Sequence, residues 1–250
     1  MKPVLKLVLA CAPMIFVAAC GGGGDLADRL DLANPAVRFV HASPLAPNLT
    51  LYRGGVAQTQ ATDVPYKSAT NYYDIDTSAA DWLVKAGTVS VDSVNIDPKR
   101  GNKYTIVALP NSATVSGLYV INDPYNKPLN STSTHLRVMN ASFSAANIDV
   151  YMNTVATNIS TVNPFISGTV YRTSGPASGS DSLDIPGGTY QVRITTAGTK
   201  TVLFSGPLTF GNNQDVLILT VPDAASAGGI KALVKVEGTG AVTEIPANGL

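Results

Sequence analysis

The 250-residue sequence is poor in charge, in histidine and in cysteine. Only 14% of its residues are charged, and its 17 basic and 17 acidic side chains cancel, so no excess of positive charge favours nucleic acid. The two histidines, His41 and His135, lie far apart in the sequence and make poor partners in a zinc site. No stretch keeps a 3.6-residue apolar period long enough to predict a helix. Nucleic-acid binding, zinc binding and a helical fold are therefore not expected.

Sequence motifs of common catalytic families are missing as well. The sequence contains no G-x-S-x-G nucleophile elbow, no H-E-x-x-H, no P-loop, no EF-hand loop, and no G-x-G-x-x-G that opens a helix. We therefore expect a protein that is not an enzyme, with no catalytic residues, no cofactor and no metal.

The N-terminus has the layout of a secretory signal. Lys2 and Lys6 precede an apolar run over residues 7–17, and small residues follow it. This run is too short to span a bilayer comfortably as a mature helix. We expect residues 1–19 to be removed on export.

Residues 17–20 read Val-Ala-Ala-Cys, which resembles the bacterial lipobox. The resemblance implies cleavage between Ala19 and Cys20, a diacylglyceryl group on the Cys20 sulfur, and an acyl chain such as palmitate on its new amino group. Several acyl chains on one residue give stable anchoring. Because Gly21 rather than Asp follows, the resemblance implies the outer membrane of a bacterial cell envelope. The alternative is an ordinary signal in which Cys20 is incidental.

The lipid would attach the mature chain to a membrane. Loss of Lys2 and Lys6 leaves 15 basic and 17 acidic side chains. The mature chain therefore has no net positive charge that would attract it to an anionic membrane surface. Cys11 leaves with the signal and Cys20 carries lipid, so the fold has no disulfide and no thiolate metal site. Four glycines from Gly21 predict a flexible tether over residues 20–35.

A duplication dominates the rest of the sequence. Residues 37–57 (VRFVHASPLAPNLTLYRGGVA) and 136–156 (LRVMNASFSAANIDVYMNTVA) align without a gap at an offset of 99, with eight identities among 21 positions. Ordinary amino-acid usage would give about one or two. The duplication predicts two domains, residues 36–127 and 128–250.

The alignment can be carried further along both repeats. The offset of 99 continues over Pro65–Tyr72, becomes 101 at residues 86–91, and becomes 112 at residues 104–110. Each aligned segment alternates apolar and polar residues next to a glycine or proline turn, which is typical of strands. Insertions therefore separate the later strands of the two repeats.

Composition and periodicity together predict an all-β protein. Each repeat shows about seven short strands, which suits two tandem antiparallel β-sandwich domains, either immunoglobulin-like or prealbumin-like. Residues 78–85 come nearest to a helix, but we expect a turn that leads into a strand, with Trp82 in the core. Thr50 and Asp149 occupy equivalent positions in this alternation, and both are expected to be exposed.

The pattern VRFVHASPLAPNLTLY is followed by a Pro-Tyr segment, an Ala-Gly turn before a strand, and a closing Tyr-Thr-Ile-Val strand. This arrangement resembles the DUF4397 domain of bacterial surface and exported proteins. The resemblance covers nearly all of residues 36–245 as two copies, although His-Ala-Ser-Pro has become Asn-Ala-Ser-Phe at residues 140–143. The family has no assigned activity, so it implies a type of fold and a surface setting but no site.

His41 is the strongest candidate for chemistry. It could act as a base, paired with Ser43 or a nearby carboxylate. Its counterpart in the second repeat is Asn140, which shares the ability to hydrogen bond but not the basicity. We therefore favour a structural role, in which each residue caps the junction of strand and turn with a hydrogen bond to the backbone.

Two pairs of acids and a set of tyrosines leave alternatives open. Asp74 with Asp76, or Asp181 with Asp184, could bind calcium weakly or act as a glycosidase pair, but solvated turn acids are the favoured interpretation. The tyrosines could form an aromatic surface for glycans or proteins, or could pack their rings in strands. They are Tyr66, Tyr72, Tyr73, Tyr119, Tyr125, Tyr151 and Tyr171.

These features predict a lipid-anchored protein of the bacterial cell envelope that serves as a non-catalytic binding, adhesion or structural module. Its partners would be the membrane, through Cys20, and a glycan or protein held by loops at residues 43–48 and 174–182. A periplasm-facing carrier or envelope-assembly factor is the main alternative. An envelope hydrolase that uses His41 or an acid pair is the third.

Overall fold

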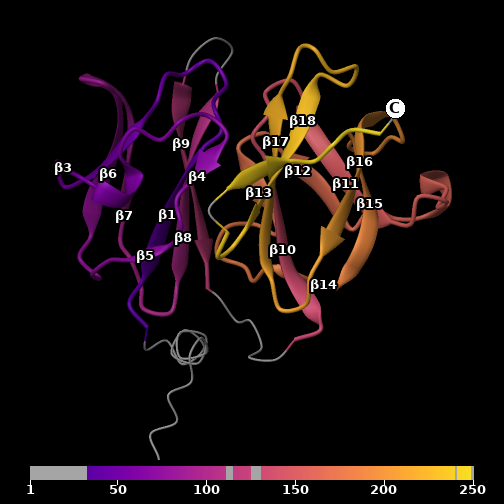
Figure 1. Ribbon diagram of the computed structural model, residues 1–250, viewed down its shortest axis with the longest axis horizontal. Helices are drawn as coiled ribbons and strands as arrows, with labels where there is room; N and C mark the ends of the chain where they lie inside the picture. Colours follow the sequence, from indigo (N-terminus) through magenta and orange to yellow (C-terminus); the bar gives the residue numbers. More distant parts are fainter. Residues whose placement is uncertain (1–32, 111–114, 125–130, 240, 249–250) are drawn as a thin grey trace, which may run out of the picture.

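A computed structural model of the chain describes residues 33–110, 115–124, 131–239 and 241–248 (Figure 1). The predicted signal peptide, its cleavage site at Ala19 and Cys20, and most of the tether lie outside the described residues. Apart from the 3-10 helices η1 (Thr59–Ala61) and η2 (Ile159–Thr161), the secondary structure of the described residues is strand. The predicted all-β fold is confirmed. None of the described helices is long and apolar enough to cross a bilayer.

The first half is a sandwich of two sheets. The inner sheet has the order β4-β1-β8-β9, with β5 also paired to β1, and the outer sheet has the order β3-β2-β6-β7. The strands are β1 (Ala36–His41), β2 (Thr50–Arg53), β3 (Val56–Ala57), β4 (Ser68–Ala69), β5 (Tyr73–Asp74), β6 (Ala80–Ala86), β7 (Val89–Ile96), β8 (Lys103–Pro110) and β9 (Val115–Asp123).

The second half repeats this plan with ten strands in its described residues. Its inner sheet has the order β13-β10-β17-β18-β19, with β14 paired to β10, and its outer sheet has the order β12-β11-β15-β16. The strands are β10 (Ser133–Asn140), β11 (Asn147–Asn153), β12 (Ile166–Val170), β13 (Thr173–Gly175), β14 (Leu183–Pro186), β15 (Gly188–Thr196), β16 (Val202–Phe210), β17 (Asp215–Pro222), β18 (Ile230–Val236) and β19 (Val242–Glu244).

Each sandwich encloses its own apolar core. In the first half, Val37 and Phe39 of β1 point to the outer sheet and are fully buried, as the period of two predicts. Trp82 lies in this core with no exposed surface, and the segment that contains it is strand β6, so both expectations for residues 78–85 are confirmed. The second half has an equivalent core between β10, β11, β15 and β17.

The strand register confirms the repeat where the sequence signal is strongest. Ala36 is paired with Lys103 in the parallel pair β1/β8, and His135 is paired with Asp215 in the parallel pair β10/β17. Ala36 and His135 stand 99 positions apart, whereas Lys103 and Asp215 stand 112 apart. These are the two offsets that the sequence predicts for these strands.

The predicted offset over Pro65–Tyr72 is wrong. Val40 pairs with Ala69, and Met139, its equivalent, pairs with Ser174. Ala69 therefore corresponds to Ser174, six positions beyond the predicted partner. These edge segments are two or three residues long, too short for their side-chain pattern to fix a register.

The predicted offset at residues 86–91 is wrong as well. Val89 begins the edge strand β7, whereas residues 188–192 belong to β15, which occupies the position of β6. Both segments begin after a glycine turn and alternate in the same way, so their local patterns do not distinguish neighbouring strands. The counterpart of β7 is β16.

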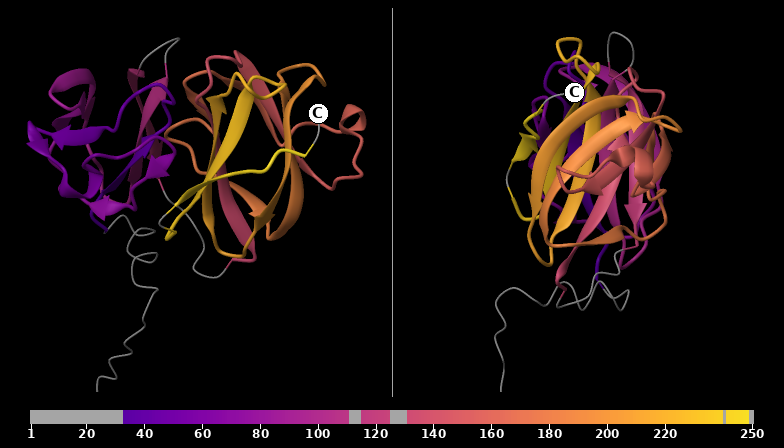
Figure 2. Two further views of the ribbon diagram at one scale, coloured as in Figure 1. Left: turned by 45° about the horizontal axis from the view of Figure 1, so that its top comes forward. Right: turned by 90° about the vertical axis from the view of Figure 1, so that its right-hand side faces the viewer.

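The two sandwiches pack against each other through their inner sheets. Figure 1 shows the four sheets side by side, and the right view of Figure 2 shows the second half in front of the first. A third apolar cluster fills this junction, with Val107 and Leu109 of β8 against residues such as Leu217 and Leu219 of β17. Strands β8 and β17 are buried on both faces, which explains their almost continuous apolar sequences.

The equivalent strands of the two halves run in the same direction along the molecule. β5 and β14 pair with the first residues of β1 and β10, and β4 and β13 pair with their last residues, as the heights of these strands in Figure 1 show. The loops that follow β1 and β10 therefore lie at one end of the molecule, which we call the distal end. Ala33, the first described residue, lies at the other end, beside the start of β1.

Candidate functional site

His41 is the last residue of β1 and is completely buried. Its Nδ1 accepts a hydrogen bond from the Ser43 backbone amide at 3.3 Å, and its Nε2 lies 3.0 Å from the Pro47 carbonyl oxygen, to which it can only donate. These partners require the neutral imidazole with its proton on Nε2. Burial lowers the pKa of His41 below its usual value, against a smaller opposing effect of the Pro47 carbonyl.

Asn140 occupies the same place in the second repeat and makes similar bonds, although its carbonyl partner stands one position earlier in the turn. Its Oδ1 accepts from the Ser142 backbone amide at 3.2 Å, and its Nδ2 donates to the Ala145 carbonyl at 2.8 Å. Thr220 adds a hydrogen bond to Oδ1. The structural role predicted for His41 is confirmed, and the imidazole keeps no nitrogen for a substrate.

The loop that His41 organises displays an apolar surface at the distal end. Leu45, between Pro44 and Pro47, is 61% exposed, and Val89 of the β6–β7 hairpin beside it is 65% exposed. They border a hollow of about 320 Å³ that contains no charged side chain in its lining. We call this the distal apolar patch; it consists of Leu45, Ala46, Pro47, Ala86, Val89, Ser90 and Val91. This confirms that residues 43–48 form an open loop.

The second half adds exposed apolar side chains at the same end. Phe143, which aligns with Pro44, is 39% exposed, and Val170 at the end of β12 is 47% exposed. Of the seven large apolar side chains that are exposed among the described residues, four therefore lie at the distal end. The other three are Val56, Val155 and Leu183.

The other predicted contact loop, residues 174–182, contacts the first half, although residues 177–181 are exposed. It lies against β9 of the first half, where the Gly179 amide donates to the Asn122 carbonyl at 2.7 Å and the Asn122 amide donates to Ser178 Oγ at 2.8 Å. Ser182 Oγ also donates to the Asp123 carboxylate. The loop joins the two halves, and its binding of an external ligand stays a prediction.

An insertion in the second repeat explains why residues 174–182 reach β9. Ala69 and Tyr73 of the first repeat correspond to Ser174 and Leu183 of the second, so the second connection is five residues longer. Arg137, only 3% exposed, organises the longer loop by donating to carbonyl oxygens of residues 176, 177 and 180. The loop forms hydrogen bonds with backbone groups on the free edge of β9. Unpaired groups on such an edge could otherwise pair with another strand.

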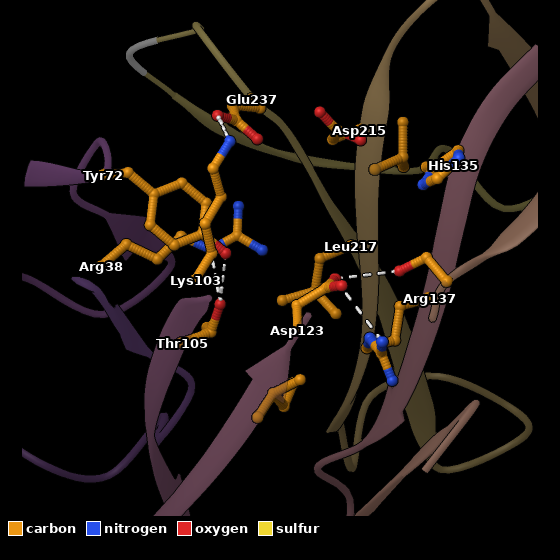
Figure 3. A pocket seen from close by; sticks show the side chains of 13 residues that line it. Arg38, Tyr72, Lys103, Thr105, Asp123, His135, Arg137, Asp215, Leu217 and Glu237 are labelled. Carbon is orange, nitrogen blue, oxygen red and sulfur yellow. Dashed lines mark hydrogen bonds and ion pairs between the residues drawn. The ribbon is translucent and has the colours of Figure 1, made fainter. Parts of the chain in front are cut away.

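Charged residues gather deeper in the junction (Figure 3). Lys103 of the first half pairs with Glu237 of the second at 3.1 Å, and Arg137 pairs with Asp123 at 3.5 Å. Arg38 lies over the Tyr72 ring, 4.6 Å from its centroid. The space among these groups is about 20 Å³, room for one water molecule. The cluster joins the halves and is too small to hold a substrate.

The predicted acid pairs are divided among other partners. Asp76 forms a two-point ion pair with Arg53, whose hydrogen bonds hold the pKa of Asp76 well below its usual value. Asp184 lies 3.0 Å from the His135 ring. Within the described ranges, no group of three or more His, Cys, Asp or Glu side chains could hold a metal ion.

The tyrosines do not form a common aromatic surface. Tyr125 lies outside the described residues, and the other six are buried or half-buried. Tyr72 packs beside Arg38, the Tyr171 hydroxyl donates to the Pro110 carbonyl across the junction, and Tyr119 packs against the junction cluster. Burial raises the pKa of Tyr66 to about 12, with smaller contributions from Glu244 and Asp223 of the other half. Ring packing is confirmed for Tyr72 and Tyr119.

Asp149 differs from the sequence expectation. It is only 6% exposed, because its two carboxylate oxygens accept hydrogen bonds from the backbone amides of Gly168 and Gly198 at 2.7 and 2.9 Å. The side chain thereby connects β11 to the irregular part of β12 and to the turn after β15. Thr50, its equivalent, accepts from the Asp63 amide and remains half-buried.

The first repeat can now be compared with known families. A DUF4397 domain occupies residues 35–151. The matching model is described as a domain of unknown function, and the match continues past the predicted boundary at residue 127 into β10 and β11. No curated protein matches the chain.

Two solved structures of carbohydrate-binding modules show a distant likeness. One is a family 41 module from streptococcal virulence factors, described for α-glucan recognition, with 11% identity, a TM-score of 0.23, and coverage of 79% of this chain and 96% of that chain. The other is a family 26 module of Eubacterium rectale Amy13K in complex with maltoheptaose, with 8% identity, a TM-score of 0.23, and coverage of 85% and 97%.

Proposed function

We propose that the protein is a lipid-anchored, non-catalytic binding module of the bacterial cell envelope, and that its distal apolar patch binds a protein partner. The observation that carries the proposal is the position of this patch. Leu45 and Val89 lie at the opposite end of the first half from Ala33, where the predicted tether enters. A lipid on Cys20 would hold the chain by one end and leave the patch free at the other.

The chemistry of the patch favours a protein over a glycan. Its lining has one hydroxyl, on Ser90, and otherwise apolar side chains, which suits an apolar segment of a partner. Pro44 and Pro47 restrict the backbone beside Leu45, and His41 fixes the loop from beneath. A loop held in this way loses little conformational freedom on binding.

Photo-crosslinking in intact cells tests the patch. A photoreactive residue at position 45 should give discrete adducts, whereas the same residue at position 155, which is 72% exposed at the other end, should give none. Val89→Asp should abolish the adducts from position 45, and Val155→Asp should leave them unchanged. Equal adducts from both positions, or none from position 45, would refute the proposal.

The lipid anchor is tested separately. Cys20→Ala should release the protein from the membrane fraction and remove the acyl groups from its N-terminal peptide in mass spectra. Protease treatment of intact cells, with a periplasmic protein as control, then tells on which side of the outer membrane the distal end lies. Retention of Cys20→Ala in membranes washed with high salt would exclude Cys20 as the anchor.

An apolar groove in the second half favours a carrier as the second candidate function. It measures about 510 Å³ and lies between β16, β18 and the segment after β19, with Phe204, Ile230 and Ile245 in its lining. Pockets of this size and character hold small ligands. Native mass spectrometry should then detect a co-purifying lipid in the wild type but not in Ala247→Trp. Absence of any non-covalently bound lipid from the wild type would exclude this function.

A further inference from the structure

A polar hollow of about 400 Å³ lies at the end of the first half opposite to the distal apolar patch. Four separate parts of the chain form it: the residues before β1, the stretch from the end of β2 to η1, the segment that begins at β5, and the loop between β7 and β8. We call it the polar hollow, and its lining consists of Asn34, Arg53, Gln58, Gln60, Tyr73, Asp74, Ile75, Asp76, Thr77 and Arg100.

The lining of this hollow has equal numbers of positive and negative side chains. Arg53 and Arg100 face Asp74 and Asp76, and Arg53 is held by both oxygens of Asp76 at 2.8 and 2.9 Å. Asn34 accepts a hydrogen bond from Arg100. A site for phosphate or for a metal ion would show a surplus of one sign. The occupant that suits this lining is therefore uncharged.

Hydrogen-bonding groups and one ring dominate the rest of the lining. Gln58, Gln60 and Thr77 carry amides or a hydroxyl that can both donate and accept. The Tyr73 ring and the buried Ile75 supply an apolar wall. Tyr73 Oη and Arg53 Nε, two of the buried polar atoms without a hydrogen-bond partner among the described residues, lie beneath this lining and do not face a ligand.

We propose that the polar hollow binds a neutral carbohydrate. Sugar hydroxyls both donate and accept, which matches amide and carboxylate side chains, and the apolar face of a sugar ring can pack on an aromatic wall such as Tyr73. A volume of 400 Å³ is within the range of small-ligand sites. This proposal concerns a different ligand and a different end of the molecule from the distal apolar patch.

Isothermal titration of the mature lipoprotein in detergent tests the site. Maltotetraose and chitotetraose serve as neutral probes, and inorganic phosphate serves as the charged one. At least one sugar should bind at millimolar concentration, and phosphate should not. Absence of binding by both sugars, or binding of phosphate in their place, would overturn the proposal.

Two matched substitutions locate the binding. Asp74→Ala should weaken sugar binding about tenfold, because an exposed carboxylate that accepts from sugar hydroxyls is lost. Asp97→Ala removes another exposed aspartate of the first half that does not line the hollow, and should leave affinity unchanged. Equal effects of the two substitutions would refute the site, whereas the outcome of crosslinking at position 45 has no bearing on it.

Discussion

His41 and Asn140 hold equivalent turns in the two repeats through a similar pair of backbone hydrogen bonds, although only His41 can titrate. Each side chain accepts from the amide two residues later and reaches a carbonyl across the turn. Because the two repeats use different side chains at this position, the turn requires the hydrogen bonds and not an imidazole ring. Its basicity is dispensable for the turn.

Replacing His41 should separate hydrogen bonding from ring chemistry. His41→Ala leaves the Ser43 amide and the Pro47 carbonyl without their buried partner and should lower the free energy of unfolding by about 1–3 kcal/mol. His41→Asn should cost less, because Asn140 shows that an amide fits this turn. Urea denaturation measures both. A larger loss in His41→Asn than in His41→Ala would contradict this account.

Stability should also depend on pH through His41. The pKa in the folded state lies below the 6.5 of an unperturbed histidine, so the unfolded chain takes up the proton first as the pH falls. The stabilisation is complete above pH 6.5 and decreases below it, by at most about 1.4 kcal/mol per pH unit, down to the folded pKa. Thermal unfolding at a series of pH values should show this decrease in the wild type and a shallower one in His41→Asn.

The junction should contribute as much stability as a sandwich core. Leu219 is fully buried between the two halves, so Leu219→Ala should lower the free energy of unfolding by about 2–5 kcal/mol. Ile218→Ala in the core of the second half gives the reference loss, and exposed Leu45→Ala should change stability by no more than about 0.5 kcal/mol. If Leu219→Ala behaves like Leu45→Ala, the halves do not pack as described.

Unfolding of the two halves should be coupled for the same reason. Trp82 is the only tryptophan and lies in the first core, so its fluorescence reports on the first half alone. Far-ultraviolet circular dichroism reports on both halves. Because the junction joins the two cores, we expect the two signals to change at the same urea concentration. Two separate transitions would show that each sandwich unfolds independently.

The strands at the start of each repeat could be predicted because their signals are local and strong. Val37 and Phe39 alternate with polar or smaller residues, and the gapless alignment with the second repeat fixes their equivalents. The edge strands could not be placed because they are short and insertions surround them. Ala69 therefore appeared to match Gly168, whereas its backbone pairing matches Ser174.

Contacts between the two halves could not be predicted from the sequence. Thr105, Val107 and Leu109 lie on the face of β8 turned away from its own core, and alternation alone predicts that such a face meets solvent. The almost continuous apolar sequence of β8 is the sign of burial on both faces that the sequence offers. The same limit applies to Arg137, whose partners are carbonyl groups of an inserted loop.

Candidate binding residues were predictable in part. The loop at residues 43–48 was found because its prolines mark a turn that the repeat preserves. The polar hollow was missed because its residues, among them Asn34, Arg53, Asp74 and Arg100, are scattered along the chain and form no motif. Only the folded strands bring them together.

The parallel pairing of β1 with β8 has a mechanical consequence. β1 is the first strand after the predicted tether, and its six pairs with β8 run from Ala36 with Lys103 to His41 with Ala108. A pull between a membrane at the N-terminal end and a partner at the distal end would act along β1. The tension would then run through the covalent backbone of β1 to the loop that carries Leu45, while the hydrogen bonds that join β1 to β8 hold this strand in its sheet. The first strand is placed to carry tension.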